Sequence, residues 1–193
     1  MYVDTSAWIK AHSSNATYNP IKEFIGDCMS GGTTLYHSEM VLSEIVHVNE
    51  KTFYDKYADG YFRKARYDGR VNPKKLKELI NYDHPEIMKD IQDSSDRLIH
   101  IVLTTSEMLD YEGNMDLFED IMRIREASGN VLGINDAKHV YIARLYGVNS
   151  FLTADGDFIA LDNDNIYALQ NERYSKEKIG RDNVILRFDA KRY

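Results

Sequence analysis

The stretch Tyr2-Val3-Asp4-Thr5-Ser6 places a carboxylate directly after a short apolar run at the start of the chain. A second stretch, Ser150-Phe151-Leu152-Thr153-Ala154-Asp155, has the same order of apolar run and acid. Short apolar runs of this kind predict buried strands. Side chains at the carboxyl ends of parallel strands meet along one edge of an open α/β sheet. We therefore expect Asp4 and Asp155 to lie near each other.

Two further acids are expected on helices that reach the same sheet edge. Glu44 lies beside an apolar helical stripe that follows Ser38, and Asp136 comes directly after Asn135. Asn135 is a suitable N-cap for a helix that ends at Gly147. Two carboxylates about 6 Å apart repel by roughly 3 kcal/mol at an effective dielectric near 20, so the group needs a cation. Oxygen ligands without nitrogen or sulfur suit Mg²⁺ or Mn²⁺.

Strands and helices alternate along most of the chain. The expected strands are residues 2–4, 33–36, 99–103, 148–153 and 165–169. This alternation predicts an α/β fold with three α/β/α layers and a mostly parallel central sheet. Residues 49–98 are polar with several helical stretches, and we interpret them as a helical insertion or cap. The chain would then be a single domain over residues 1–193, with a C-terminal extension at 170–193.

The composition limits the class of protein. The 193 residues are 43% hydrophobic and 28% charged, which is enough for one domain with a sizeable core. The net charge of −7 means that nucleic acid would have to bind through a local basic patch or a metal. Cys28 is the single cysteine, which excludes an intramolecular disulfide and favours the reducing cytoplasm. Since no apolar run approaches the roughly 20 residues of a membrane span, we expect no membrane association.

Four segments resemble the motifs of the PIN-domain ribonuclease family, in the family's order. They are Tyr2-Val3-Asp4-Thr5-Ser6-Ala7-Trp8-Ile9, His37-Ser38-Glu39-Met40-Val41-Leu42-Ser43-Glu44-Ile45, Gly133-Ile134-Asn135-Asp136-Ala137 and Leu152-Thr153-Ala154-Asp155-Gly156-Asp157-Phe158. The acids of the four motifs match Asp4, Glu44, Asp136 and Asp155, and Asp157 is an alternative or additional ligand. The resemblance covers roughly residues 1–48 and 99–169.

This resemblance implies a metal-dependent endoribonuclease. Asp4, Glu44, Asp136 and Asp155 would be its catalytic and metal-binding residues, and Mg²⁺ or Mn²⁺ its cofactor. RNA phosphodiesters would be hydrolysed through a metal-activated water. Many small members of the family resemble VapC-type toxins, which implies a protein antitoxin as a partner; a homodimer is a further option. The 49–98 insertion and the C-terminal extension depart from a compact toxin.

Other interpretations of these residues stay open. Asp136 and Asp155 could be helix or turn caps. A phosphatase of the haloacid-dehalogenase type also begins with an aspartate after a strand, but it needs a second aspartate where Ser6 stands. The non-enzymatic alternative is a catalytically silent PIN-like RNA-binding or scaffold protein. Aromatic and basic residues alternate over 53–70 and could contact RNA, although ring spacing there favours packing. His139, one turn after Asp136, could touch a phosphate, although a position at the surface is favoured.

Overall fold

The computed structural model describes the chain except for residues 16–18, 66–72, 112–114, 162–163, 171–183 and 190–193. The chain divides into two compact units. The first unit comprises Met1–Val41 and Val102–Tyr193, and the second comprises Leu42–Ile101. No helix in the described part of the chain combines the length and the apolar composition that crossing a membrane requires.

A parallel sheet forms the centre of the first unit. Its strands are β1 (Tyr2–Val3), β2 (Tyr36–His37), β3 (Glu107–Met108), β4 (Ser150–Thr153), β5 (Asn165–Gln170) and β6 (Val184–Asp189). They lie in the order β3-β2-β1-β4-β5-β6, and every neighbouring pair is parallel. The chain therefore moves outward from β1 in one direction and from β4 in the other. In sheets of this kind, ligands bind at the carboxyl ends of the two strands where the direction switches.

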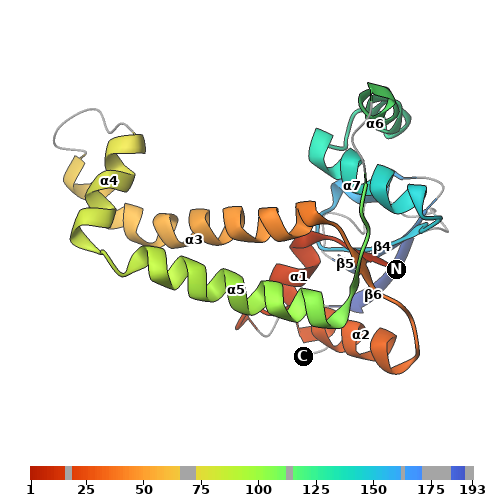
Figure 1. The fold of residues 1–193 in the computed structure, drawn as a ribbon, viewed down its shortest axis with the longest axis horizontal. Helices are drawn as coiled ribbons and strands as arrows, with labels where there is room; N and C mark the ends of the chain where they lie inside the picture. Colours follow the sequence, from red (N-terminus) through yellow and green to blue (C-terminus); the bar gives the residue numbers. More distant parts are fainter. Residues whose placement is uncertain (16–18, 66–72, 112–114, 162–163, 171–183, 190–193) are drawn as a thin grey trace. The chain divides into compact units, whose positions relative to one another are not determined.

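Helices cover both faces of this sheet. Helices α1 (Thr5–Ala11) and α2 (Asn19–Ser30) lie on one face, and α6 (Met115–Ala127) and α7 (Ile134–Leu145) lie on the other, as Figure 1 shows. A short 3-10 helix, η2 (Asp157–Ala160), follows β4. Tyr2 and Val3 pair in register with Phe151 and Leu152, and all four side chains are fully buried. The predicted three-layer α/β/α fold with a parallel sheet is confirmed.

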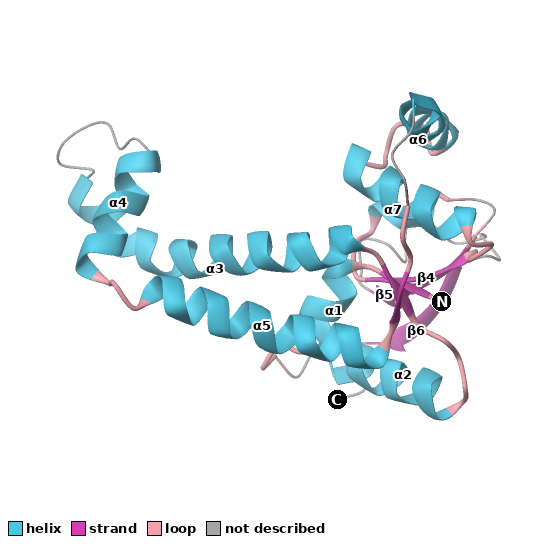
Figure 2. Cartoon of the chain, in the orientation of Figure 1, coloured by secondary structure: helices cyan, strands magenta, loops and turns pink. Residues whose placement is uncertain are grey.

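The second unit is helical in its described residues (Figure 2). It contains most of α3 (Glu39–Ala65), all of α4 (Pro73–Asp83) and most of α5 (Ile87–Thr105). Helices α3 and α5 run side by side, and Asn49 Nδ2 donates a hydrogen bond to Ser95 Oγ at 3.1 Å. The core of this unit comprises Tyr54, Ala58, Leu76, Ile80, Ile87 and Ile91. The helical insertion is thus confirmed, while its membership of a single domain with the rest of the chain stays a prediction.

The aromatic and basic segment of the second unit has a packing role where its side chains are described. Tyr54 is buried in the helical core and donates a hydrogen bond to Asn81 Oδ1 at 2.7 Å. The ring of Tyr57 packs on that of His84, with centroids 4.5 Å apart. Packing is therefore confirmed for these two rings. Phe53 also packs against this core, and Lys56 Nζ lies over the Tyr57 ring, whereas the candidates from Tyr61 to Arg70 lie outside the described side chains.

The strand predicted at residues 99–103 is wrong, because these residues belong to α5. Leu98 and Val102 are buried four residues apart, whereas Leu103 is 52% exposed, which is the burial pattern of a helix face. β-Branched residues favour strands only weakly, and tertiary packing overrides that preference. The strand beside β2 is instead β3, whose two side chains are both exposed, so that no buried apolar run marks it in the sequence.

The boundaries of the four other predicted strands also differ, since β1 ends at Val3 rather than Asp4 and β4 begins at Ser150 rather than Val148. The second strand begins at Tyr36 rather than Thr33, and β5 begins at Asn165 as predicted but continues to Gln170. The predicted C-terminal extension includes β6, which adds an outer strand to the sheet beside β5. The rest of that extension, residues 171–183 and 190–193, lies outside the described residues.

Candidate metal centre

Asp4 lies in the turn between β1 and α1, at the switch point of the sheet. Its carboxylate oxygen Oδ2 accepts hydrogen bonds from the Ser6 amide at 3.2 Å, the Ser6 hydroxyl at 2.5 Å and the Thr153 hydroxyl at 3.1 Å. The Asp4 amide donates to the Leu152 carbonyl at 2.9 Å. Asp4 is thus the N-cap of α1, yet it is only 4% exposed and is tied to the end of β4.

Asp155 lies just beyond β4 and shares a hydroxyl with Asp4. Its amide donates to Thr153 Oγ1 at 2.9 Å, the same oxygen that donates to Asp4. Asp155 Oδ1 accepts a hydrogen bond from the Asp157 amide at 3.0 Å, so the carboxylate also caps the turn into η2. Asp157 itself is half-buried in the first turn of η2, next to the fully buried Phe158. The interpretation of Asp155 as a turn cap is therefore confirmed.

Asp136 lies in the first turn of α7, but the cap predicted for this helix is wrong. The N-cap is Gly133, two residues before Asn135, which is exposed inside the helix. The Gly133 amide donates to Asp136 Oδ2 at 3.1 Å, so the carboxylate of Asp136 reaches back over the helix start. A Cβ atom at position 133 would lie 2.8 Å from that oxygen. The absence of a Cβ at Gly133 thus provides the space that the Asp136 carboxylate occupies. Capping preferences alone do not predict this close contact.

These aspartates form one electrostatic group. The pKa of Asp136 is raised to about 6, first by burial and then by the negative charges of Asp4 and Asp155, against the lowering effects of the Gly133 amide and His139. Within the described residues, no lysine or arginine forms an ion pair with Asp4, Asp136 or Asp155. Among the described residues, these three aspartates are therefore stabilised by hydrogen bonds and not by a lysine or arginine ion pair.

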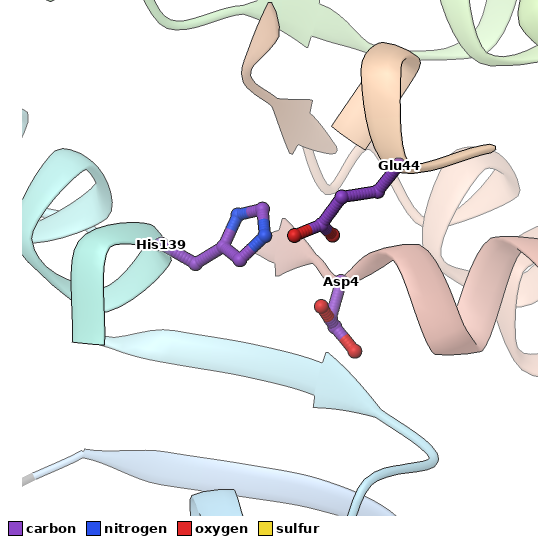
Figure 3. A group of neighbouring side chains, drawn as sticks. All are labelled: Asp4, Glu44 and His139. Atoms are coloured by element: carbon purple, nitrogen blue, oxygen red, sulfur yellow. The ribbon is translucent and has the colours of Figure 1, made fainter. Parts of the chain in front are cut away.

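Three potential ligand atoms meet at this group. One atom each from Asp4, Glu44 and His139 lies within 4.8 Å of the other two. Figure 3 shows the Glu44 carboxylate and the His139 imidazole facing each other, with the Asp4 carboxylate beside them. Glu44 is carried by the second turn of α3, the helix that begins at Glu39 directly after β2 and Ser38.

The cluster contains two of the predicted ligands and one residue that the prediction placed elsewhere. Asp136, Asp155 and Asp157 are not in this 4.8 Å cluster among the described residues. Asp136 and Asp155 are instead linked to Asp4 electrostatically, because the charges of Asp4 and Asp155 both raise the pKa of Asp136.

The expected surface position of His139 is wrong, because this side chain is only 1% exposed. Its Nδ1 atom lies 2.6 Å from the Tyr2 hydroxyl, which also lies 2.7 Å from Ser38 Oγ. The Tyr2 and His139 rings have centroids 5.7 Å apart. A sequence signal existed: residues three apart share a helix face, so His139 lies on the same side of α7 as Asp136.

The arrangement can hold a dication at the carboxyl end of β1, which is the site expected of an open parallel sheet. Comparison with known families agrees with that geometry. The PIN domain matches residues 1–164, which is most of the chain and includes every candidate ligand. A search of curated proteins gave no significant match. PIN domains are typically metal-dependent nucleases, and PIN nucleases act on RNA. The chain belongs to the PIN domain family.

Proposed function

We propose that this protein is a metal-dependent endoribonuclease with Asp4, Glu44, Asp136 and Asp155 as its catalytic centre. The observation that carries the proposal is the accumulation of Asp4, Asp136 and Asp155 at the β1–β4 switch point, where no lysine or arginine among the described residues forms an ion pair with them. Burial and then the charges of Asp4 and Asp155 raise the pKa of Asp136. Titratable groups perturbed by burial and by like charges are concentrated at functional sites. A purely structural cap has no need of three neighbouring acids.

The donor set fits a divalent cation. Carboxylate oxygens are the ligands that Mg²⁺ and Mn²⁺ prefer, and Asp4 and Glu44 already offer one oxygen each within 4.8 Å. Asp136 and Asp155 would add charge or further oxygens, with Asp157 as an additional candidate. A dication bound there would neutralise charge on the scissile phosphate and lower the pKa of a water.

The residues of the chain orient these ligands. Two hydroxyls and one amide fix Oδ2 of Asp4, and Thr153 couples that oxygen to the backbone of Asp155. The Gly133 amide holds Asp136 in a similar way. Ligands that are fixed before a metal or a substrate arrives need little rearrangement, which favours precise binding.

The finer hypothesis is that the protein is the VapC-like toxin of a toxin–antitoxin pair. Its support is the resemblance of the four motifs, whereas the long helical insertion argues against a compact toxin. If the hypothesis is right, expression of the wild-type chain should arrest bacterial growth and an Asp4→Asn variant should not. Growth that is equal for both would contradict the toxin role and leave the nuclease proposal standing.

The central experiment compares Asp4→Asn with Asp27→Asn. Asp27 is an exposed acid on α2, so its loss should leave activity unchanged. Asp4→Asn keeps the size of the side chain and removes its charge, so we expect Mn²⁺-dependent RNA cleavage to fall about 10²- to 10³-fold, since metal assistance contributes several kcal/mol.

Circular dichroism checks that both variants are folded, and cleavage is measured on single-stranded and structured RNA. Equal activity in the two variants would contradict the proposal. A wild-type protein that cleaves neither RNA with Mg²⁺ or Mn²⁺ would favour the silent RNA-binding or scaffold alternative.

A further inference from the structure

His139 brings a nitrogen atom to a centre whose other candidate ligands are oxygens. The residue lies on α7 one turn after Asp136 and is almost fully buried. One of its ring atoms lies within 4.8 Å of carboxylate oxygens from Asp4 and Glu44. In Figure 3 a ring nitrogen points toward the Glu44 carboxylate. Because Nδ1 is engaged with Tyr2, the nitrogen that faces this carboxylate is Nε2.

The hydrogen bonds of the Tyr2 hydroxyl determine which of the two His139 ring nitrogens carries the proton. This hydroxyl has a single hydrogen and two close partners, Ser38 Oγ at 2.7 Å and His139 Nδ1 at 2.6 Å. If Tyr2 donates to Ser38, it accepts from the Nδ1–H group of His139, and Nε2 then carries a lone pair. If Tyr2 donates to Nδ1, Nε2 carries the hydrogen and cannot bind a metal. Hydrogen bonding at one ring nitrogen is the usual way in which proteins select the ligating tautomer of the other.

We infer that His139 Nε2 is a ligand of the dication held by Asp4 and Glu44, and that Tyr2 positions this ring for binding. The inference rests on the metal centre of the proposed function and specifies its chemistry. Mg²⁺ prefers oxygen ligands and retains its waters, whereas imidazole suits first-row transition ions. The centre therefore prefers a transition dication such as Mn²⁺ to Mg²⁺.

Three substitutions test the two roles, with a fourth as control. His139→Gln removes the imidazole and retains a polar side chain of similar reach. His139→Ala removes the ligand entirely. Tyr2→Phe keeps the ring that packs against Phe151, with centroids 5.9 Å apart, and removes only the hydroxyl. His12→Gln is the control, because His12 is an exposed histidine at the end of α1.

Binding of Mn²⁺ and of Mg²⁺ is measured by titration calorimetry on the full-length protein without RNA. His139→Gln and His139→Ala should weaken Mn²⁺ binding tenfold or more while changing Mg²⁺ binding by less than about threefold. Tyr2→Phe should weaken Mn²⁺ binding about tenfold, since loss of a residue behind the ligand typically has effects of 10- to 100-fold. Circular dichroism establishes that each variant is folded, and Tyr2→Phe serves if the His139 variants are not.

Pulsed electron paramagnetic resonance gives a second, direct measurement. Mn²⁺ bound to the wild-type protein should show coupling to a histidine nitrogen, and this coupling should disappear in His139→Gln and persist in His12→Gln. An uncoupled wild-type spectrum, an unchanged ratio of Mn²⁺ to Mg²⁺ affinity in the His139 variants, or a wild-type protein that binds neither ion would overturn the inference.

The two proposals fail in different ways. Nitrogen-coupled Mn²⁺ in a protein that does not cleave RNA would remove the proposed function and support the role of His139. Cleavage that requires Asp4 but shows no nitrogen coupling would support the proposed function and exclude His139 as a ligand.

Discussion

The two units of this chain treat charged side chains in opposite ways. In the helical unit, Lys77 Nζ pairs with Glu50 Oε1 at 2.7 Å, and both side chains are well exposed to solvent. In the sheet unit, Asp4 is buried, and burial together with the charges of Asp4 and Asp155 raises the pKa of Asp136. An exposed ion pair contributes about 0–1 kcal/mol, so the helical unit derives its stability from its apolar core.

The difference between the units shows where function is to be expected. Like charges that are held together lower the stability of a metal-free protein, and such an arrangement persists where a ligand relieves it. The helical unit has charge that solvent and opposite partners already satisfy. Stability and function are therefore separable by substitution. We expect substitutions in the helical core to lower the free energy of unfolding, and removal of an acid from the sheet unit to raise it.

The largest effect on stability is expected in the core of the helical unit. Ile80 is fully buried there, among Leu76, Ile87 and Ile91. Ile80→Ala should lower the free energy of unfolding by about 2–5 kcal/mol, because the variant loses apolar contact and leaves a cavity. Its neighbour Leu79 is 53% exposed, so Leu79→Ala should change the same quantity by less than about 0.5 kcal/mol. Urea unfolding measures the free energy of unfolding of both variants. An equal decrease in the two would show that the core lies elsewhere.

A stabilising change of intermediate size is expected at Asp136. The pKa of this carboxyl is about 6 in the folded protein and near 4 in the unfolded chain. The folded protein therefore binds more protons between pH 4 and pH 6, and its stability falls as the pH rises through that window. The shift corresponds to about 3 kcal/mol, which we halve because the carboxyl is partly exposed.

Asp136→Asn should remove this pH-dependent loss of folding stability. In EDTA at pH 7.5, the variant should melt a few degrees above the wild type, while at pH 4 the two should melt together. Added Mn²⁺ should then stabilise the wild type more than the variant. A variant that melts below the wild type at pH 7.5 in EDTA would show that burial and the neighbouring acids do not destabilise the ionised Asp136.

The smallest effect on stability is expected at Gly133. Glycine to alanine at a compatible position usually stabilises a protein by about 0.4–1 kcal/mol. At position 133, however, the new Cβ would lie 2.8 Å from Asp136 Oδ2 and displace the carboxylate. Gly133→Ala should therefore bring little or no gain in stability and should weaken Mn²⁺ binding. Gly26→Ala is the matched control, since a Cβ there meets no atom within 4 Å. Calorimetric titration with Mn²⁺ compares the two variants, and equal Mn²⁺ affinities would rule out a role for this contact.

Local sequence patterns were sufficient for the strands that carry the centre. β1 and β4 are short, buried and apolar on both faces, so each appears as a continuous apolar run followed by an acid. β3 has two exposed residues and no such pattern, and the β-branched run at 99–103 belongs to a helix. Strand prediction therefore succeeded where burial and local preference agree, and failed where tertiary packing decides between them.

The same limit applies to the centre. Asp4 and Glu44 could be proposed from their positions after predicted elements, and both contribute to the 4.8 Å cluster. His139 could not be placed in that cluster from α7 alone, because its burial depends on Tyr2 of β1 and Ser38 beyond β2. These partners are 137 and 101 residues away in the chain, so no local window contains them.

The amino-acid sequence by itself determined the order of strands and helices around the sheet centre and the acids that follow β1 and β4, because periodic burial and strand ends are local properties. Only the tertiary structure decided that His139 is buried against Tyr2, that α5 continues through residues 99–103, and that Gly133 makes room for Asp136. Those outcomes depend on which distant surfaces meet, since burial, close contact and pKa shifts arise from neighbours in space.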